Sequence, residues 1–149
     1  MKEGVKIDIM PVDQAILNFG NRWYGHAMES AQTVSLLEDI SINLISAPCF
    51  LTTKIEAFQS DTRGTFLTSR DMDDIVGILD GRLEIVSETQ AAQQEVRFFL
   101  AETFQKYLQD DDFLEALDAL LYPDAASQAR RPIILSRMAQ IVEQSKLTI

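Results

Sequence analysis

The sequence of 149 residues contains one cysteine, Cys49, and one histidine, His26. A single cysteine excludes a disulfide within the chain and a metal centre built from several cysteines. A single histidine excludes a metal site with two histidine ligands from one chain, and it leaves one candidate for a histidine-based triad. We therefore expect Cys49 to be a small buried residue and His26 to have a structural rather than a catalytic role.

Basic residues are scarce as well. The sequence has 13 lysines and arginines against 23 aspartates and glutamates, which gives a net charge of −10. Because non-specific binding to nucleic acid depends on basic residues that neutralise phosphates, this balance disfavours it. A polyanion would need a local group of cations, for which Lys54, Arg63, Arg70 and Arg22 are the candidates. The alternative is that these residues are ordinary solvated surface charges.

Several patterns that would indicate a membrane protein or a known enzyme class are missing. No apolar run reaches about 18 residues and there is no charged-then-apolar leader, so the sequence indicates neither a transmembrane span nor secretion, and we expect a cytoplasmic protein. There is no Walker-type phosphate loop, no G-x-S-x-G or H-E-x-x-H motif and no zinc-ligand spacing. The length and the 46% of hydrophobic residues fit one domain with an ordinary core.

The sequence does contain two amphipathic helical patterns within residues 46–81. The first is predicted to begin at Ala47-Pro48, since proline suits the opening turn of a helix, and to end near Ser60. The second is predicted to begin after an N-cap at Ser69 and to end at Gly81. Their apolar stripes consist of Leu51, Ile55 and Phe58 in the first helix and Met72, Ile75, Val76 and Leu79 in the second.

These two helices carry charges at fixed places beside their apolar stripes. Lys54 lies one position from the stripe of the first helix, and Asp71 and Asp74 share one flank of the second. The pattern predicts that a cation and two carboxylates are held on neighbouring rigid elements. Acids along an exposed helical face are the ordinary alternative.

Alternating apolar residues predict strands in the N-terminal part of the chain. One strand covers residues 5–9 and ends before Pro11, with Asp8 on the face away from the apolar side. Two more, at residues 33–37 and 40–44, are joined by a turn and read as a hairpin. The sequence thus predicts a sheet of at least three strands.

Residues 12–30 mix glycine and asparagine with large aromatic residues, which predicts a loop or short helical turns packed on the sheet. Trp23 and Tyr24 could stack on a nucleic-acid base, but the interpretation we favour is that they belong to the core.

Helical patterns fill the C-terminal half. A capping box that opens at Ser87 predicts one helix to about residue 109, and Asp110 is among the aspartates that can cap the next. The last pattern starts at Asp124, and Pro132 is expected to break or kink it. The fold class we predict is α/β, a small N-terminal sheet packed with helices and followed by a helical half, in a single compact domain over residues 1–149.

Two stretches resemble the lysine helix and the aspartate helix of minimal nucleotidyltransferases of the abortive-infection toxin type: TKIEAF and, after a short loop with arginine and glycine, RDMDDI. The segments IDIMPVD, NRWY and DAASQARRP resemble other parts of bacterial proteins of that group. Such enzymes begin with a strand and a helix that carry a Gly-Ser pair and then an Asp-x-Asp, and neither precedes the strand of Asp8 in this sequence. The resemblance therefore covers only the middle and the C-terminal part of the sequences in that family.

The resemblance implies Mg²⁺-dependent transfer of a nucleotide from a nucleoside triphosphate to an acceptor, in a toxin–antitoxin setting. It implies a partial nucleotidyltransferase-like core over residues 1–86 and a helical extension over residues 87–149. The implied catalytic and metal-binding carboxylate is Asp8, and the implied nucleotide-binding residues are Lys54, Arg70, Asp71 and Asp74. Because one strand carboxylate cannot hold two metal ions, we expect little or no transfer by this chain alone.

Three hypotheses remain open at this point. The chain could be a nucleotidyltransferase, an interaction or regulatory protein in which Lys54 and the aspartates form structural salt bridges, or a nucleotide-binding module without transfer activity. A sheet that begins with the strand of Asp8 would also have an unpaired edge, and such edges bind other chains. We therefore expect association into a homo-oligomer through the edge of the N-terminal sheet, and no partner in a membrane.

Overall fold

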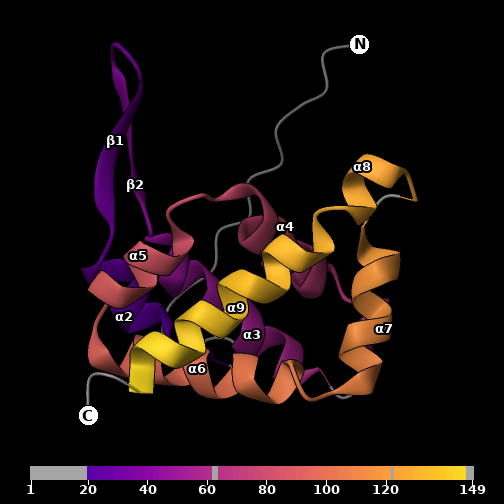
Figure 1. Cartoon of the computed structure of the whole chain (residues 1–149). Coiled ribbons are helices and arrows are strands. Elements are labelled where there is room, and N and C mark those ends of the chain that lie inside the picture. Colours follow the sequence, from indigo (N-terminus) through magenta and orange to yellow (C-terminus); the bar gives the residue numbers. More distant parts are fainter. Residues whose placement is uncertain (1–19, 62–63, 122, 147–149) are drawn as a thin grey trace.

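The computed structural model describes residues 20–61, 64–121 and 123–146. Within these residues the protein is mostly helical, with a small two-stranded antiparallel sheet (Figure 1). This agrees with the mixed helix and sheet layout predicted from the sequence. The predicted strand over residues 5–9, with Asp8, lies outside the described residues, as does Arg63. The described elements are α2 (Tyr24–Glu29), β1 (Gln32–Leu37), β2 (Ile40–Leu44), α3 (Ala47–Ser60), α4 (Arg70–Gly81), α5 (Ile85–Ala91), α6 (Gln94–Tyr107), α7 (Asp111–Leu120), α8 (Ala125–Gln128) and α9 (Arg131–Lys146).

The predicted hairpin is present, but its relation to the helices differs from the prediction. Strands β1 and β2 pair antiparallel with Val34 opposite Ile42 and Ser35 opposite Ser41. The hairpin projects from the helical body, and every residue of both strands is exposed (Figure 1). The prediction of a sheet packed with helices is therefore wrong for this hairpin. Sequence alternation predicts which side chains share a face, but not whether another element covers that face.

The two central helices begin where the sequence predicts. Ser46 is the N-cap of α3, where its side chain accepts a hydrogen bond from the Cys49 amide, and Pro48 lies in the first turn. Ser69 caps α4 in the same way through the Met72 amide. Cys49 is buried, as expected. Helix α2 contacts α3. Trp23, the N-cap residue of α2, lies in the core at 5% exposure, as the favoured interpretation predicts, whereas Tyr24 is half-buried and does not belong to the core.

The single helix predicted from Ser87 to about residue 109 is wrong, because the structure has two. Helix α5 already begins at Ile85, and the Ser87 hydroxyl donates to the Glu84 carbonyl instead of forming a capping box. Extended backbone at Ala92 and Gln93 separates α5 from α6. Neither glycine nor proline lies at this break, so the usual helix-breaking residues could not predict it. Both helices contact α9.

The C-terminal helices follow the sequence more closely. Asp110 caps α7 through the amides of Asp112 and Phe113. Asp124 caps the short helix α8. Pro132 is the second residue of α9, where its missing N–H costs no hydrogen bond, so the predicted break falls just before it.

One hydrophobic core runs through the helical body. Helix α9 crosses α4, α5 and α6, and its buried residues join those of α3 and α4 in a single cluster (Figure 1). No helix in the part of the chain that the structure describes is long and apolar enough to cross a membrane. The core includes Leu51, Ile55, Met72, Ile75, Leu79, Leu100, Phe104, Phe113, Ile134 and Met138, all at 0% exposure.

Candidate functional site

The candidate site lies where α3 and α4 pack together. Both apolar stripes predicted from the sequence supply buried residues on these helices: Leu51 and Ile55 on α3, and Ile75 and Leu79 on α4. Because the stripes meet in the core, the residues that flank them are brought to the rim of the same helix pair. The backbone of both helices is thereby fixed by packing, which is the support that a precise binding site needs.

At this rim Lys54 of α3 lies between two carboxylates of α4. Its Nζ atom is 3.0 Å from Asp71 Oδ1 and 2.6 Å from Asp74 Oδ2. The exposed fractions of the three side chains are 27% for Lys54, 30% for Asp71 and 47% for Asp74. The structure thus brings together the cation and the two carboxylates that the sequence placed on neighbouring elements, and all three remain accessible to solvent.

The electrostatic environment of Lys54 follows from these contacts. Partial burial by itself lowers the pKa of Lys54, but hydrogen bonds to Asp74 and Asp71 and their negative charges raise this pKa above its ordinary value. The ammonium also lies 5.5 Å from the centre of the Phe50 ring, one helical turn earlier on α3, in a cation–π contact. One ammonium facing two carboxylates leaves the cluster with a net charge of −1.

In the part of the chain that the structure describes, two other expected cations, Arg22 and Arg70, form no ion pair with Asp71 or Asp74. Arg22 forms an ion pair with Glu56 at 3.2 Å and lies over the rings of Trp23 and Phe99. Arg70 is exposed at the first position of α4. Among the described residues, Lys54 is therefore the expected cation that pairs with the two aspartates, and their two negative charges exceed its one positive charge.

His26 makes two structural contacts. Its Nδ1 atom is 2.6 Å from Gln93 Oε1, and its Nε2 atom is 3.1 Å from a carboxylate oxygen of Glu95. Both partners lie at the start of α6, so His26 connects α2 to the break between α5 and α6. These contacts fit the structural role expected from the sequence.

No protein-family model matches the chain, and no curated protein or solved structure matches it either. The resemblance carried by residues 53–58 and 70–75 thus stays a prediction, and it is weighed below against the geometry of Lys54 and its partners.

The donor set of the site suits one hydrated Mg²⁺ ion better than a two-metal centre. Magnesium keeps several waters and is commonly held by one or two carboxylates together with substrate phosphates. Asp71 and Asp74 offer such a pair, and each carboxylate has lone pairs beyond those that face Lys54. Among the described residues there is no group of three or more histidines, cysteines, aspartates or glutamates that could hold a metal ion. Asp8, implied as a further ligand, lies outside those residues.

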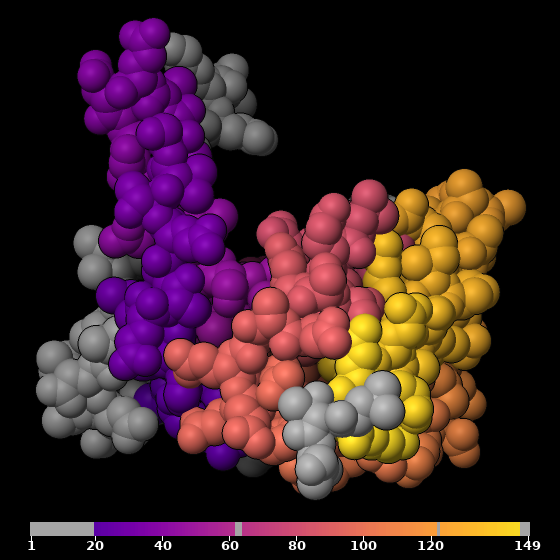
Figure 2. All heavy atoms as spheres, turned by 60° about the vertical axis from the view of Figure 1, so that its left-hand side comes forward, coloured from indigo at the N-terminus to yellow at the C-terminus, as the bar shows by residue number. Residues whose placement is uncertain are grey.

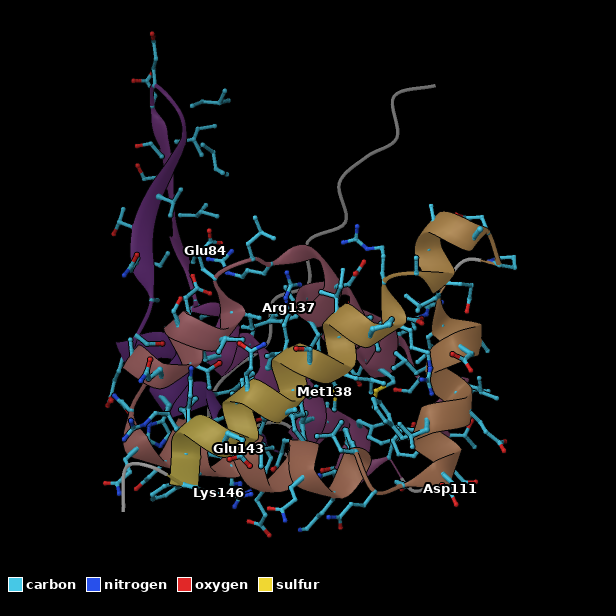
Figure 3. All side chains as sticks on the ribbon, viewed as in Figure 1. Glu84, Asp111, Arg137, Met138, Glu143 and Lys146 are labelled. Carbon is cyan, nitrogen blue, oxygen red and sulfur yellow. The ribbon has the colours of Figure 1, made fainter. Side chains whose placement is uncertain are left out.

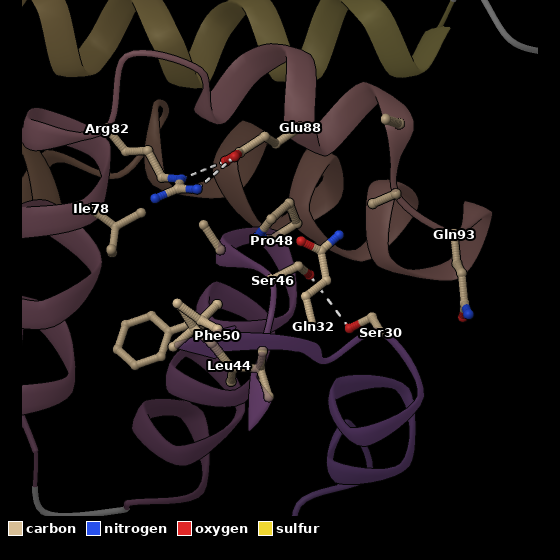
Figure 4. Close-up of a pocket in the computed structure, with 15 residues that line it drawn as sticks. Ser30, Gln32, Leu44, Ser46, Pro48, Phe50, Ile78, Arg82, Glu88 and Gln93 are labelled. Atoms are coloured by element: carbon tan, nitrogen blue, oxygen red, sulfur yellow. Dashed lines mark hydrogen bonds and ion pairs between the residues drawn. The ribbon is translucent and has the colours of Figure 1, made fainter. Parts of the chain in front are cut away.

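A second feature near the site was not predicted from the sequence. A pocket of about 610 Å³ lies at the base of the hairpin, between the strands and helices α3, α4 and α5 (Figure 4). Phe50 lines this pocket and also contacts Lys54, so the pocket and the charged rim are neighbours. At the pocket, Arg82 forms a two-pronged ion pair with Glu88 at 2.6 and 2.7 Å. The alternation of the strands indicates an apolar face, but the pocket depends on how the helices are placed.

The Lys54 cluster should contribute to stability in a pH-dependent way. Replacing Lys54 by methionine keeps the apolar stem and leaves two carboxylates close together without their cation. We expect the free energy of unfolding to fall by about 1–2 kcal/mol, between the effects known for exposed and for buried pairs, because the three groups are about one-third to one-half exposed. Urea unfolding at neutral pH, with Lys106→Met as an exposed control, measures this loss.

The raised pKa of Lys54 sets the sign of the pH dependence. A raised pKa in the folded state means that the contribution is complete below the ordinary lysine pKa of about 10.4 and is lost as the pH rises through the folded value. The difference in stability between the parent and Lys54→Met should therefore be constant near neutral pH and shrink in the alkaline range above about pH 10.4. A difference that grew with alkaline pH would contradict the assignment.

Proposed function

We propose that this chain belongs to a nucleotidyltransferase-type protein, in which Lys54 binds the phosphates of a nucleoside triphosphate and Asp71 and Asp74 hold the Mg²⁺ ion that accompanies them. The observation that carries the proposal is the position of the Lys54 ammonium between two partly exposed carboxylates on two packed helices. The resemblance of residues 53–58 and 70–75 to the lysine and aspartate helices of such enzymes supports it.

The charges of the cluster complement such a ligand. Lys54 supplies a cation for phosphate oxygens, and the aspartates supply carboxylates for a cation that accompanies the nucleotide. A free anion alone would meet a cluster of net charge −1, so we expect nucleotide to bind together with a divalent cation and poorly without it. Magnesium bound there would neutralise charge on the phosphates during transfer. The packed helices would hold Lys54 and the aspartates in place, which is most of what phosphoryl and nucleotidyl transfer requires of a protein.

Calorimetric titration with ATP and Mg²⁺, repeated with the other nucleoside triphosphates, tests the proposal. Lys54→Ala removes a charged hydrogen-bond donor and should weaken binding by about 10- to 100-fold, which corresponds to 1.5–3 kcal/mol for a hydrogen bond to a charged group. The control Lys106→Ala removes an exposed lysine that pairs with Glu102 within α6, and it should leave binding unchanged. Titrations are made well below the melting temperature of each variant, so that the modest loss of stability in Lys54→Ala does not affect them.

Two results would contradict the proposal. One is the absence of detectable nucleotide binding by the parent chain with Mg²⁺ at millimolar concentrations. The other is equal binding by the parent and Lys54→Ala. If labelled nucleotide is transferred and Asp8→Asn abolishes the transfer, the acids outside the described residues complete the site.

A second candidate function rests on a different observation. The hairpin exposes large aliphatic side chains away from the body, with Leu37 at 66% and Leu44 at 53% exposure. Soluble domains seldom expose such a patch unless it is an interaction surface. On this interpretation the chain is a non-catalytic interaction protein, and the Lys54 cluster is a structural salt bridge. Nucleotide binding lost in Lys54→Ala separates the two candidates.

A further inference from the structure

The two faces of the hairpin differ sharply in polarity. On one face the directly opposite residues are polar, and their side chains contact each other across the strands. Thr33 donates to Asn43 at 3.0 Å, and the hydroxyls of Ser35 and Ser41 are 3.4 Å apart. The polar side chains of this face form hydrogen bonds with one another, and the face can remain exposed to solvent.

The opposite face is apolar and has no cover among the described residues. Val34 lies opposite Ile42, and a register shift after Ser35 places Leu37 opposite Ile40. Because side chains alternate along a strand, Val34, Ile40, Ile42 and Leu44 share one face, and the register shift brings Leu37, opposite Ile40, to that face as well. Their exposed fractions are 37% for Val34, 66% for Leu37, 50% for Ile40, 40% for Ile42 and 53% for Leu44. An isolated two-stranded hairpin is marginally stable, so this face gains from being covered.

The apolar face continues into the pocket at the base of the hairpin. Val34 and Leu44 belong to this face and also line the pocket, and the helical wall of the pocket includes Phe50 and Ile78 (Figure 4). The space-filling view shows the hollow between the projecting hairpin and the helical body (Figure 2). The molecule therefore presents one L-shaped apolar surface, formed by the hairpin face and the pocket.

We propose that this L-shaped surface binds the same surface of a second copy of the chain, with the hairpins antiparallel and face to face. In this arrangement the tip of each hairpin, with Leu37 and Ile40, enters the pocket at the base of the other. The two contacts are identical, as a two-fold interface requires. The two copies match in this arrangement because the distance from the hairpin tip to the pocket, which is the length of the hairpin, is the same in both.

Charge placement supports the antiparallel orientation. The turn of the hairpin carries Glu38 and Asp39, and the pocket of the other copy has Arg82 at its wall. Arg82 pairs with Glu88, but its side chain is 48% exposed and its guanidinium has N–H groups beyond the two that face Glu88. A parallel arrangement would instead bring the two acidic turns together. Each copy also carries a net charge of −10, which opposes association over a longer range. Dimerisation should therefore strengthen with salt, which screens this repulsion while leaving the apolar contact intact.

The surface is small, so the dimer should be weak. Specific interfaces bury at least about 1,000 Å² in total, and the contact proposed here is confined to two hairpin faces and two pockets. We expect a dissociation constant in the micromolar range. The proposal does not depend on nucleotide binding at Lys54, and either one can fail while the other holds.

Sedimentation equilibrium of the full chain from about 1 to 100 µM, at low and at high salt, tests the proposal. The parent should dimerise. Ile42→Lys, on the apolar face, should raise the dissociation constant at least about tenfold, which is 1.4 kcal/mol. Ser41→Lys adds the same charge to the polar face of the same strand and should leave the dimer intact. Should Ile42→Lys melt at a much lower temperature than Ser41→Lys, Ile42→Thr replaces it, because threonine keeps a β-branched side chain.

Mixing two defective variants gives a sharper test. Ile40→Lys damages the tip, and Ala91→Arg adds a bulky charged side chain to the pocket wall. Either variant alone damages both contacts of its own dimer. An equimolar mixture retains one intact contact, because the native tip of one chain meets the native pocket of the other. We expect the mixture to dimerise more strongly than either variant alone and more weakly than the parent.

Three outcomes would overturn the proposal. The first is a parent chain that stays monomeric up to about 100 µM at high salt. The second is a dimer that Ile42→Lys and Ser41→Lys leave equally intact, which would assign association to another surface, such as the strand edges. The third is a monomer that binds a lysine-rich amphipathic helical peptide in a manner that Ile42→Lys abolishes, since that would assign the face to a helical partner.

Discussion

Replacing Phe113 by alanine should lower the free energy of unfolding by about 3–5 kcal/mol, the range for truncating a buried phenylalanine. Phe113 is at 0% exposure and belongs to a group of aromatic rings. Its ring is 5.0 Å from that of Tyr107 on α6 and 5.4 Å from that of Phe66 in the loop before α4. The substitution removes contacts on both sides, because the two neighbours come from different parts of the chain.

Urea unfolding followed by circular dichroism measures this effect. Phe113→Leu keeps most of the apolar volume and should cost less than half as much. Leu83→Ala removes a side chain that is 76% exposed, and it should stay within about 0.5 kcal/mol of the parent. Equal losses for Phe113→Ala and Leu83→Ala would show that the aromatic group does not fasten α7 to the body.

The second large effect is expected at Arg137, which joins α9 to the end of α4. Its guanidinium donates from one nitrogen to the carbonyl oxygens of Leu79 and Asp80, both at 2.6 Å. Arg137 lies next to Met138 on α9, and Met138 is fully buried (Figure 3). The last carbonyls of a helix have no partner within the helix and carry its negative dipole end, so a cation there is favourable.

Arg137→Met should lower the free energy of unfolding by about 2–3 kcal/mol, because partly buried carbonyls lose a charged donor and methionine cannot replace it. Lys106→Met, which removes an exposed pair within α6, should cost about 0.3–0.5 kcal/mol. Thermal and urea unfolding of both variants compare the two. A loss for Arg137→Met as small as that of the control would mean that water replaces the donor without cost.

The position of Arg137 also concerns the candidate site. It holds the C-terminal end of α4, and the same helix carries Asp71 and Asp74 near its N-terminal end. Nearby, Arg130 forms an ion pair with the carboxylate of Asp80 at 2.5 Å. Helix α4 is thus attached at its end by the C-terminal helices and along its apolar side by the core. The two aspartates are therefore presented to Lys54 by a helix with little freedom to shift.

The two proposals use different parts of one molecule. The Lys54 cluster lies on the rim of the α3 and α4 pair, while the apolar surface lies on the hairpin and in the pocket, with Phe50 between them. If nucleotide binding and dimerisation both occur, Phe50 is the contact through which one could affect the other. The variants at Ile42 and Lys54 keep the two activities separate.

The sequence by itself determined most of the local structure of this protein. Alternating apolar residues predicted the hairpin, Pro48 and Ser69 predicted the starts of α3 and α4, and Asp110 predicted the start of α7. It also placed Lys54 beside one apolar stripe and the aspartates beside another. These features could be predicted because each depends on residues within a few positions of one another.

Only the tertiary structure decided what these elements face. The strands could have lain under helices, yet the structure leaves them exposed and places a pocket at their base. The break at Ala92 and Gln93 follows from the contacts of α5 and α6 with α9, since the local sequence would allow a continuous helix. The distances from Lys54 to Asp71 and Asp74 likewise depend on how two stripes pack, and packing joins residues far apart in the chain, which no local pattern encodes.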